Sequence, residues 1–405
     1  MAKPIPWLMS LLVCCAVAVS GYAQDVTDVA GNTVTVEFIV HVPADTPVAD
    51  TVYLCGDHPA FGNWDGRGLE LERGYDGTYQ GSLTIEHGLV LQYKATRGSW
   101  ETVEKNAGGG ESVNRQVIAD ADKRVTVMVE GWAVGEADRP EPSLTGDIRK
   151  HADFRSGILD NERTLIVYLP PGYEQDESVR YPVLYMHDGQ NIFDASTSFA
   201  GHEWGVDEAA ERLIQTGKIE PIIIVGMYNN SERMTEYTPR PEDDQADAYA
   251  RFVVEEVKPY IDRTYRTDPA REKTGIVGSS LGGLISLYMV WAHEDTFGLC
   301  GGVSPYLGWR DRWLIQQWRA SDMAWSAEAK IWIDMGTREG QVRDTGVSDT
   351  VVNARTLAGV LGEAGSRPGE GHIYLEVQDG EHNEQAWSQR IDQILLYLYG
   401  TAETP

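Results

Sequence analysis

The sequence predicts two domains: an all-β antiparallel sandwich, then an α/β domain with a mostly parallel sheet and helices on both faces. Short apolar runs separated by turn residues fill the first third of the chain, whereas strand-length runs alternate with longer helical patterns in the rest. A length of 405 residues also exceeds what one ordinary core accommodates. We therefore expect a β domain over 30–132, a linker over 133–144 and an α/β domain over 145–402.

The elements of both domains are predicted from apolar periodicity. Residues 34–40 alternate between apolar and polar, as in a half-buried strand, and further short runs follow between glycine-rich turns. The linker has two prolines and little apolar content. The strands expected in the second domain are 164–168, 183–186, 222–225, 274–277, 331–334 and 373–377. The helices expected between and after them are 204–215, 246–261, 281–293 and 384–398.

The first residues are typical of a secretory signal. Lys3 precedes an apolar run over 7–19, and small residues stand before a cleavage point near Gln24. We therefore expect 1–23 to be a signal peptide and the mature protein to be secreted or periplasmic. No later segment is long and apolar enough for a membrane span, so no integral membrane segment is expected after signal removal.

The net charge and the cysteine content argue against nucleic-acid binding, membrane-surface binding and metal binding. The formal net charge of -28 disfavours nucleic acid as a partner, because phosphates are bound by Lys and Arg. It also disfavours an anionic membrane surface. Cys55 and Cys300 lie in apolar runs of different domains and are expected to be buried thiols. No CxxC or HExxH spacing occurs, so no structural or catalytic metal is expected.

Residues 278–282 (GSSLG) fit the GxSxG pattern. A short apolar strand precedes them and a helical pattern follows, which is the strand–turn–helix setting of a nucleophile elbow in an α/β hydrolase. The flanking glycines avoid clashes in the sharp turn, and the helix N-terminus favours a developing negative charge. Ser280 is therefore the predicted nucleophile.

A serine nucleophile requires a histidine base, and in this fold the base follows it in the chain. Three histidines follow Ser280. His293 ends the elbow helix, and His372 begins the last strand, at the wrong end of a parallel sheet for ligands. His382 comes just after that strand, at the carboxyl edge where the serine also emerges. His382 is therefore the predicted base.

The acid that orients the base should follow the strand 331–334. Asp334 stands at the end of this strand and suits a loop-capping role, whereas Glu339 lies in the following loop and can reach toward His382. We favour Glu339 and keep Asp334 as the alternative. Asp379 is a more distant candidate.

The oxyanion hole requires two backbone amides. The amide of Leu281, directly after the nucleophile, is one expected donor. The other should come from the loop after an early strand, where Gly189 permits close backbone approach and the amide of Gly189 or Gln190 is the candidate. His187 and Asp188 in the same loop precede the serine and are interpreted as loop-shaping residues.

The second domain resembles the Putative esterase family, which includes esterase D, feruloyl and acetylxylan esterases and enterochelin esterases. The resemblance implies acyl-ester hydrolysis by a serine triad without a cofactor. In related esterases the acid falls in a GT-x-[DE] segment, which matches Glu339 and strengthens that choice. The matching segments are 164–173 (TLIVYLPPGY), 181–194 (YPVLYMHDGQNIFD), 223–239 (IIVGMYNNSERMTEYTP), 278–283 (GSSLGG) and 334–340 (DMGTREG).

Several side chains in loops above the sheet are candidates for substrate contact, because aromatic-rich loops can line an acyl or sugar pocket. They are Trp204, Arg233, Glu236, Tyr237 and Trp309.

The first domain resembles starch-binding modules of the family 20 and 48 type. The match lies in 52–64 (VYLCGDHPAFGNW) and 93–100 (YKATRGSW). In such modules two tryptophans form a flat platform for sugar rings, and these positions correspond to Trp64 and Trp100. Lys94 is a possible hydrogen-bonding neighbour. A starch-like polysaccharide is therefore an expected partner.

The sequence thus predicts an exported serine esterase that hydrolyses acyl esters, with carbohydrate-linked esters as the expected substrates. Three alternatives remain: an enterochelin-type siderophore esterase, an acyltransferase with the same triad, and a glycan-binding protein with a dormant hydrolase domain. The order of serine, acid and histidine along the chain argues against the dormant alternative.

Overall fold

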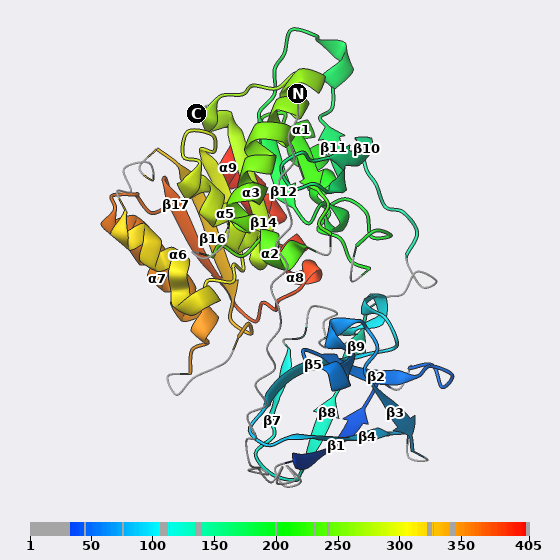
Figure 1. Ribbon diagram of the computed structural model, residues 1–405. Helices are drawn as coiled ribbons and strands as arrows, with labels where there is room; N and C mark the ends of the chain where they lie inside the picture. Colours follow the sequence, from blue (N-terminus) through cyan, green and yellow to red (C-terminus); the bar gives the residue numbers. More distant parts are fainter. Residues whose placement is uncertain are drawn as a thin grey trace, which may run out of the picture.

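The computed structural model describes residues 33–401 apart from short internal segments, namely 44–45, 75–76, 106–111, 113, 134–139, 199–200, 231, 241–243, 322–325, 327 and 341–345. An N-terminal β-rich domain and a larger α/β domain are apparent in Figure 1. The predicted signal peptide and the middle of the linker lie outside the described residues.

The N-terminal domain contains a seven-stranded sheet of order β7-β5-β2-β3-β4-β1-β8. A two-stranded ribbon of β6 and β9 accompanies it. The seven strands are β1 (Thr33–His41), β2 (Val52–Gly56), β3 (Leu69–Arg73), β4 (Tyr79–Glu86), β5 (Val90–Thr96), β7 (Arg115–Ile118) and β8 (Lys123–Met128). The ribbon consists of β6 (Glu104–Lys105) and β9 (Gly131–Trp132).

This sheet bends around its own apolar core. Phe38 of β1 packs on Tyr93 of β5 with ring centroids 5.4 Å apart, although three strands lie between β1 and β5 in the sheet order. Phe61 contacts both rings and completes a buried aromatic cluster. The predicted β-rich domain is therefore confirmed. The expectation of purely antiparallel pairing is wrong at one place, because β1 and β8 pair in parallel.

The C-terminal domain is built on an eight-stranded mixed sheet of order β10-β11-β13-β12-β14-β15-β16-β17. The strand β11 is antiparallel to both of its neighbours, and the remaining pairs are parallel. The strands are β10 (Asp147–Arg155), β11 (Glu162–Leu169), β12 (Val183–His187), β13 (Ile223–Met227), β14 (Thr274–Ser279), β15 (Leu299–Val303), β16 (Lys330–Gly336) and β17 (His372–Val377).

The strands expected from sequence omit β10 and β15. The first is a polar edge strand whose residues lack a buried run. The second contains Gly301 and Gly302, which lower intrinsic strand propensity. Close packing requires glycine at both positions, because a Cβ at Gly301 would lie 2.8 Å from Val277 and one at Gly302 would lie 2.8 Å from Leu287. Only tertiary contacts therefore identify β15 as a central strand.

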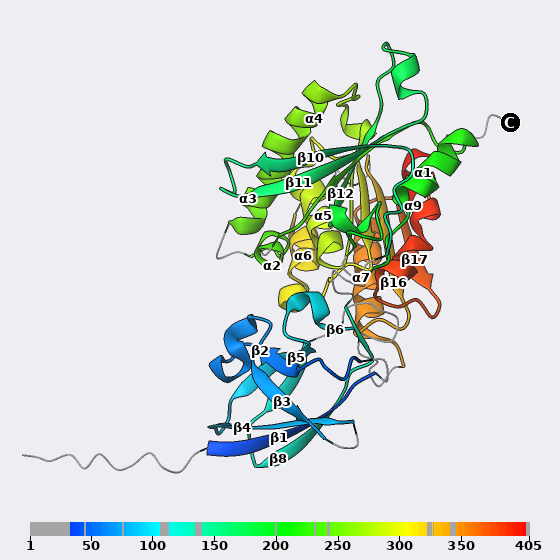
Figure 2. The same cartoon turned by 90° about the vertical axis from the view of Figure 1, so that its right-hand side faces the viewer.

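Helices cover both faces of the sheet, as predicted, and Figure 2 shows α1 and α9 on the side opposite α3, α4, α5 and α6. The face of α1 and α9 carries α1 (Val206–Gln215), α8 (Glu384–Ser388) and α9 (Ile391–Tyr399). The other face carries α3 (Gln245–Arg251), α4 (Lys258–Thr264), α5 (Leu281–Ala292), α6 (Trp309–Ala320) and α7 (Asp349–Glu363).

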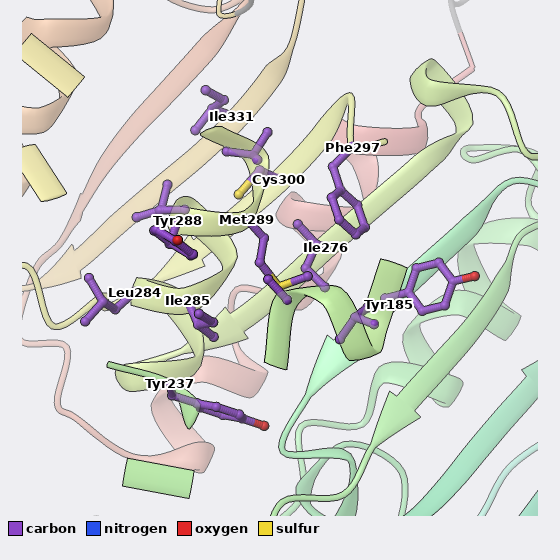
Figure 3. Packing of buried hydrophobic residues seen from close by; sticks show 14 of the residues in the cluster. Tyr185, Tyr237, Ile276, Leu284, Ile285, Tyr288, Met289, Phe297, Cys300 and Ile331 are labelled. Atoms are coloured by element: carbon purple, nitrogen blue, oxygen red, sulfur yellow. The ribbon is translucent and has the colours of Figure 1, made fainter. Parts of the chain in front are cut away.

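The core beneath α5 consists of buried apolar side chains. Figure 3 shows Leu284, Ile285 and Met289 of this helix beside Ile276 of β14. All four side chains are buried. Burial on this scale holds α5, and with it the residue that precedes the helix, firmly against the sheet.

A buried ion pair ties β11 to the short helix α2 (Arg233–Glu236), which follows β13. Arg163 and Glu236 are 2.7 Å apart with side chains 1% and 2% exposed. Glu236 is thus occupied by a structural partner and does not line a substrate pocket, contrary to expectation.

Cys55 and Cys300 are buried free thiols, which confirms the expectation for them. Within the part of the chain that the structure describes, no helix combines the length and apolar character needed to span a membrane.

Candidate active site

Ser280 occupies the sharp turn between β14 and α5. Its backbone has φ 56° and ψ −117°, an unfavourable conformation for a residue with a side chain. The Ser280 amide donates to the carbonyl of Val303, and the Ser280 carbonyl accepts from the amide of Tyr306, each at 3.0 Å. The neighbouring strand β15 and the loop after it therefore help to hold the strained turn in place.

The turn also depends on two glycines. A Cβ at Gly278 would lie 2.6 Å from the carbonyl carbon of Gly282, a distance that no real contact permits. The strand end and the first turn of α5 are thus in backbone contact. This geometry agrees with the prediction that glycines flank the serine because larger residues would clash in the sharp turn.

The structure brings Ser280, His382 and Glu339 together in one hydrogen-bonded row. The Oγ of Ser280 lies 2.9 Å from Nε2 of His382. The Nδ1 of His382 lies 2.7 Å from Oε2 of Glu339. This arrangement places a base beside a hydroxyl and a carboxylate behind the base, as general-base activation of a serine requires.

Glu339 is buried, with 2% of its side chain exposed, and its second oxygen is also held. Oε1 accepts from the hydroxyl of Ser304 at 2.7 Å and from the amide of Gly336 at 2.8 Å. Two donors on one oxygen fix the orientation of the carboxylate. The other oxygen is thereby directed at the imidazole.

Beneath Glu339 lies a polar network that sequence reasoning missed. The hydroxyl of Ser304 accepts from Nε1 of Trp387 at 3.1 Å and from Nη1 of Arg390 at 2.9 Å, so its one donor and two acceptor sites are all used. Arg390 also forms a buried ion pair with Asp334 at 2.5 Å. The ring of Trp387 stands edge-on to His382 at 5.0 Å. No local motif marks these residues, because they come from three distant segments.

The structure separates the candidates for the acid. Asp334 lies inside β16, where it accepts from the Ser304 amide and from Trp332 Nε1 besides pairing with Arg390. Although it lies inside a strand, it holds the start of the loop after β15 through the Ser304 amide. Asp379 is exposed and pairs with Arg338 at 3.1 Å. Glu339 is the carboxylate that contacts His382.

The loop after β12 lies beside the first turn of α5. A Cβ at Gly282 would lie 3.3 Å from Oδ2 of Asp188, which places this loop at the elbow. Gly189 has no room for a side chain, since its Cβ would lie 2.5 Å from the backbone of Gly226 in β13. The candidate donors Gly189 and Gln190 thus lie on a backbone segment packed tightly against the sheet edge.

Asp188 shapes this loop through three side-chain contacts. Its backbone is left-handed, with φ 56°. Arg233 donates to both of its oxygens, at 2.8 and 2.7 Å, and Asn229 donates to Oδ1 at 2.6 Å. The backbone N–H of Asn229 also donates to Gln190 Oε1, at 3.2 Å. The loop is therefore clamped by the segment after β13.

His187 is buried at the end of β12 and its Nδ1 lies 2.9 Å from the hydroxyl of Tyr249. Burial lowers the pKa of His187 to about 3. The imidazole is therefore neutral at physiological pH, which suits a packing role in the loop and not proton exchange with solvent.

The expected pocket residues have different outcomes. Trp204 is 4% exposed and packs against Trp387, and Tyr237 is fully buried, so the expectation that they line an open pocket is wrong. Both are large aromatic side chains that the core absorbs. Arg233 is 23% exposed and paired with Asp188. Trp309 is partly buried, and its indole donates to the carbonyl of Pro239 at 3.0 Å.

Tyr306 is a candidate contact residue that sequence reasoning missed. Its side chain is 46% exposed, and its amide is bonded to Ser280. No sequence signal marked it, because β15, the strand before it, is not predicted from the sequence.

In the N-terminal domain, Trp64 and Trp100 lie together on the surface and outside the core cluster. Their ring centroids are 5.8 Å apart with an interplanar angle of 39°, and Trp100 Nε1 donates to the Trp64 carbonyl at 2.8 Å. Trp100 is 37% exposed. Lys94 is partly exposed on β5. Trp64 is half-buried, so the pair offers one exposed and one partly exposed indole, with apolar faces of the kind that sugar rings contact.

Comparison with protein families agrees with this division. Residues 156–398 match the family described as Putative esterase. Residues 33–127 match the family described as Starch binding domain.

Individual relatives match one domain or the other. The ferri-bacillibactin esterase BesA of Bacillus subtilis is 26% identical over 53% of this chain and 81% of its own length. The uncharacterized protein YjcH of the same organism is 27% identical over 60% of this chain and 93% of its own. An alpha-amylase of Niallia circulans is 39% identical over 24% of this chain, which corresponds to 8% of the amylase.

Solved structures share the fold. The enterobactin esterase FES of Shigella flexneri aligns over 93% of this chain and 95% of its own with a TM-score of 0.50 and 16% identity. The siderophore hydrolase EstB of Aspergillus nidulans aligns over 66% of this chain and 99% of its own with a TM-score of 0.51 and 16% identity. At this identity the likeness concerns the fold alone.

The elbow geometry predicts that Gly278→Ala destabilises the protein, because its Cβ would overlap the backbone of Gly282. We expect a loss of about 1–3 kcal/mol, measured by urea unfolding. Gly359→Ala in α7 is the matched control, since nothing lies within 4 Å of its Cβ. The control should gain about 0.5–1 kcal/mol from its helical position. Equal stability of Gly278→Ala and the parent would contradict the close backbone contact.

Proposed function

The chain belongs to the Putative esterase family, and we propose that it is a serine carboxylic-ester hydrolase with Ser280, His382 and Glu339 as its catalytic triad. The observation that carries the proposal is the unbroken row of hydrogen bonds from the Ser280 hydroxyl through His382 to Glu339. The strained backbone of Ser280 supports the same assignment, since such strain concentrates at nucleophile elbows.

In this mechanism the Ser280 Oγ attacks the ester carbonyl carbon while His382 Nε2 accepts the hydroxyl proton. Glu339 stabilises the imidazolium and holds Nδ1 protonated. Collapse of the tetrahedral intermediate breaks the ester C–O bond, and His382 returns the proton to the departing alcohol. Water then attacks the acyl-serine with His382 as base, which releases the acid and regenerates the hydroxyl.

The oxyanion of the tetrahedral intermediate is held by the amide of Leu281 and a second amide from Gly189 or Gln190. Support comes from the position of Leu281 as the first residue of α5, where the helix N-terminus favours negative charge. The clamp of Asp188 by Arg233 and Asn229 keeps the second loop in place before substrate arrives, which is the condition for effective electrostatic stabilisation.

Carbohydrate-linked esters are the proposed substrates. The starch-binding domain match and the adjacent surface indoles of Trp64 and Trp100 support binding of a polysaccharide. Lys94 is the proposed hydrogen-bonding neighbour. A module that holds glycan raises the local concentration of esters attached to it. Figure 1 shows the N-terminal domain on the side of the esterase domain where α2 and α8 lie. The latter helix begins two residues after His382.

A siderophore ester is the second candidate substrate. The name of the bacillibactin esterase relative favours it. The starch-binding domain favours carbohydrate. An acyltransferase would use the same residues and differ only in whether an alcohol replaces water in the second step. Comparing hydrolysis of acetylated or feruloylated oligosaccharides with that of a catecholate trilactone separates the two substrate classes.

We also propose that residues 1–23 are a signal peptide and that the protein is exported.

Replacing Ser280 with alanine should abolish hydrolysis of a short-chain nitrophenyl ester, because the nucleophile is lost. Glu339→Gln should lower kcat by about 10³–10⁴-fold, since the imidazole loses its orienting charge. Both are measured by steady-state kinetics on the mature protein. Equal activity of Ser280→Ala and the parent would exclude this mechanism.

Asp334→Asn is the matched control for Glu339→Gln. It removes a buried carboxylate from the same network, so we expect a stability loss of about 3–5 kcal/mol, because Arg390 keeps only the longer contact with Glu339, at 3.6 Å, as an ion pair. The kcat of the folded fraction should stay within about tenfold of the parent. A larger effect on kcat at Asp334 than at Glu339 would transfer the acid role to Asp334.

Starch binding should depend on the indole side chains of Trp64 and Trp100. In the Ser280→Ala background, Trp64→Ala and Trp100→Ala should each weaken binding to soluble starch by about tenfold, measured by affinity electrophoresis. Met128→Ala, which truncates a residue 56% exposed on β8, is the control and should bind normally. Unchanged retention of both tryptophan variants would remove the platform from the proposal.

Export predicts a processed N-terminus. Protein recovered from the medium or periplasm should begin near Gln24 by N-terminal sequencing. Recovery only of an intact, membrane-bound chain would contradict cleavage.

A further inference from the structure

We propose that Glu203, Asp207 and Glu208 form a binding site for one hard divalent cation, of which Ca²⁺ is the best match, and that the ion fastens the end of the interdomain linker to α1. The site is separate from the triad and independent of the proposed function. One carboxylate oxygen from each residue lies within 4.8 Å of the others.

Each of the three carboxylates uses one oxygen to hold either the end of the linker or the residue directly after it. Asp207 Oδ2 accepts from the amide of Thr145 at 2.7 Å, and Glu208 Oε1 accepts from the Thr145 hydroxyl at 2.9 Å. Glu203 Oε1 accepts from the hydroxyl of Ser143. The cluster therefore joins the end of the linker to the start of α1.

The second oxygen of each carboxylate is buried without a hydrogen-bond partner among the described residues. These atoms are Glu203 Oε2, Asp207 Oδ1 and Glu208 Oε2. Asp207 is the most telling of the three, because its side chain is 0% exposed and bulk solvent does not reach the free oxygen. A buried acceptor of this kind needs a donor or a positive charge, and a cation can serve all three oxygens at once.

No positive side chain in the described part of the chain forms an ion pair with any of the three residues; the nearby Arg212, for example, pairs with Asp392. The N-terminus of α1 supplies only a partial positive charge to Asp207 and Glu208 in its first turn. Three close carboxylates cannot all remain ionised without a counter-charge. A cation resolves this conflict while leaving the linker contacts intact.

The donor chemistry selects the class of ion. All candidate ligands are carboxylate oxygens, and no histidine or cysteine belongs to the cluster. Hard cations prefer oxygen, and Ca²⁺ accepts irregular geometry with six to eight ligands, whereas Mg²⁺ demands a near-ideal octahedron. Sequence motifs did not reveal the site, because Glu203 precedes α1 and the folded linker is needed to orient all three side chains.

The competing occupant is a proton. A carboxylate of the cluster that lacks a counter-charge can take up a proton in place of a cation. Because a cation replaces this proton, its stabilising effect should grow with pH.

The test is thermal denaturation of the full mature protein, first stripped with EDTA and then titrated with CaCl₂ at about pH 8.5 and about pH 5.5. We expect Tm to rise by about 5 °C at saturating Ca²⁺ at the higher pH, and by less at the lower pH. Tb³⁺ serves as a second probe, since Trp204 adjoins Glu203 in the chain and can sensitise its luminescence. Calorimetry should give one ion per chain.

Asp207→Asn should remove the Ca²⁺ response while keeping a stable fold, because the amide mimics the protonated acid. Glu203→Gln provides a second variant if the first fails to fold. Asp295→Asn, at an exposed position after α5, is the control and should respond like the parent. The absence of a Tm shift and of Tb³⁺ luminescence in the parent would overturn the proposal in favour of a shared proton. An undiminished response in folded Asp207→Asn or Glu203→Gln would also overturn it.

Discussion

The close backbone contact between Gly278 and Gly282 is the constraint on which the catalytic half of the molecule depends. It lets α5 leave the sheet immediately after β14, with Ser280 held in a strained conformation between them. The energy that maintains this strain comes from the apolar packing of α5 against both neighbouring strands. The small residues of β15 belong to the same arrangement, since larger ones would push the helix and its strand apart.

A second constraint acts on the acid side of the row. Glu339 is held by Ser304 and Gly336, and Ser304 is in turn held by Arg390 and Trp387. This network converts the burial of a carboxylate, which is costly by itself, into a fixed orientation toward His382. Asp334 balances the charge of Arg390 and so contributes to the same network without touching the imidazole.

The two domains differ in how they present aromatic side chains. In the esterase domain most tryptophans and tyrosines of the predicted pocket loops are absorbed into the core, as Trp204 and Tyr237 illustrate. In the N-terminal domain Trp64 and Trp100 remain on the surface although an aromatic cluster fills the core beside them. Adjacent indoles that stay outside the core and remain at least partly exposed are a common feature of binding surfaces. The linker that joins the domains ends on a cluster of carboxylates at the start of α1, so its last residues are part of the esterase domain's surface.

The sequence by itself determined the two-domain division, the fold class, the elbow at Ser280 and the chain order that led to His382 and Glu339. These follow from local periodicity, from a compact motif and from the rule that parallel strands present their carboxyl ends at one edge. Only the tertiary structure decided which carboxylate contacts His382, that Ser304 and Arg390 support it, and that Trp204 and Tyr237 are core residues. Two further features were decided only by the tertiary structure. They are the parallel pairing of β1 with β8 and the gathering of Glu203, Asp207 and Glu208. Each depends on contacts between segments far apart in the chain, and no local pattern encodes the distance or the burial that such contacts produce.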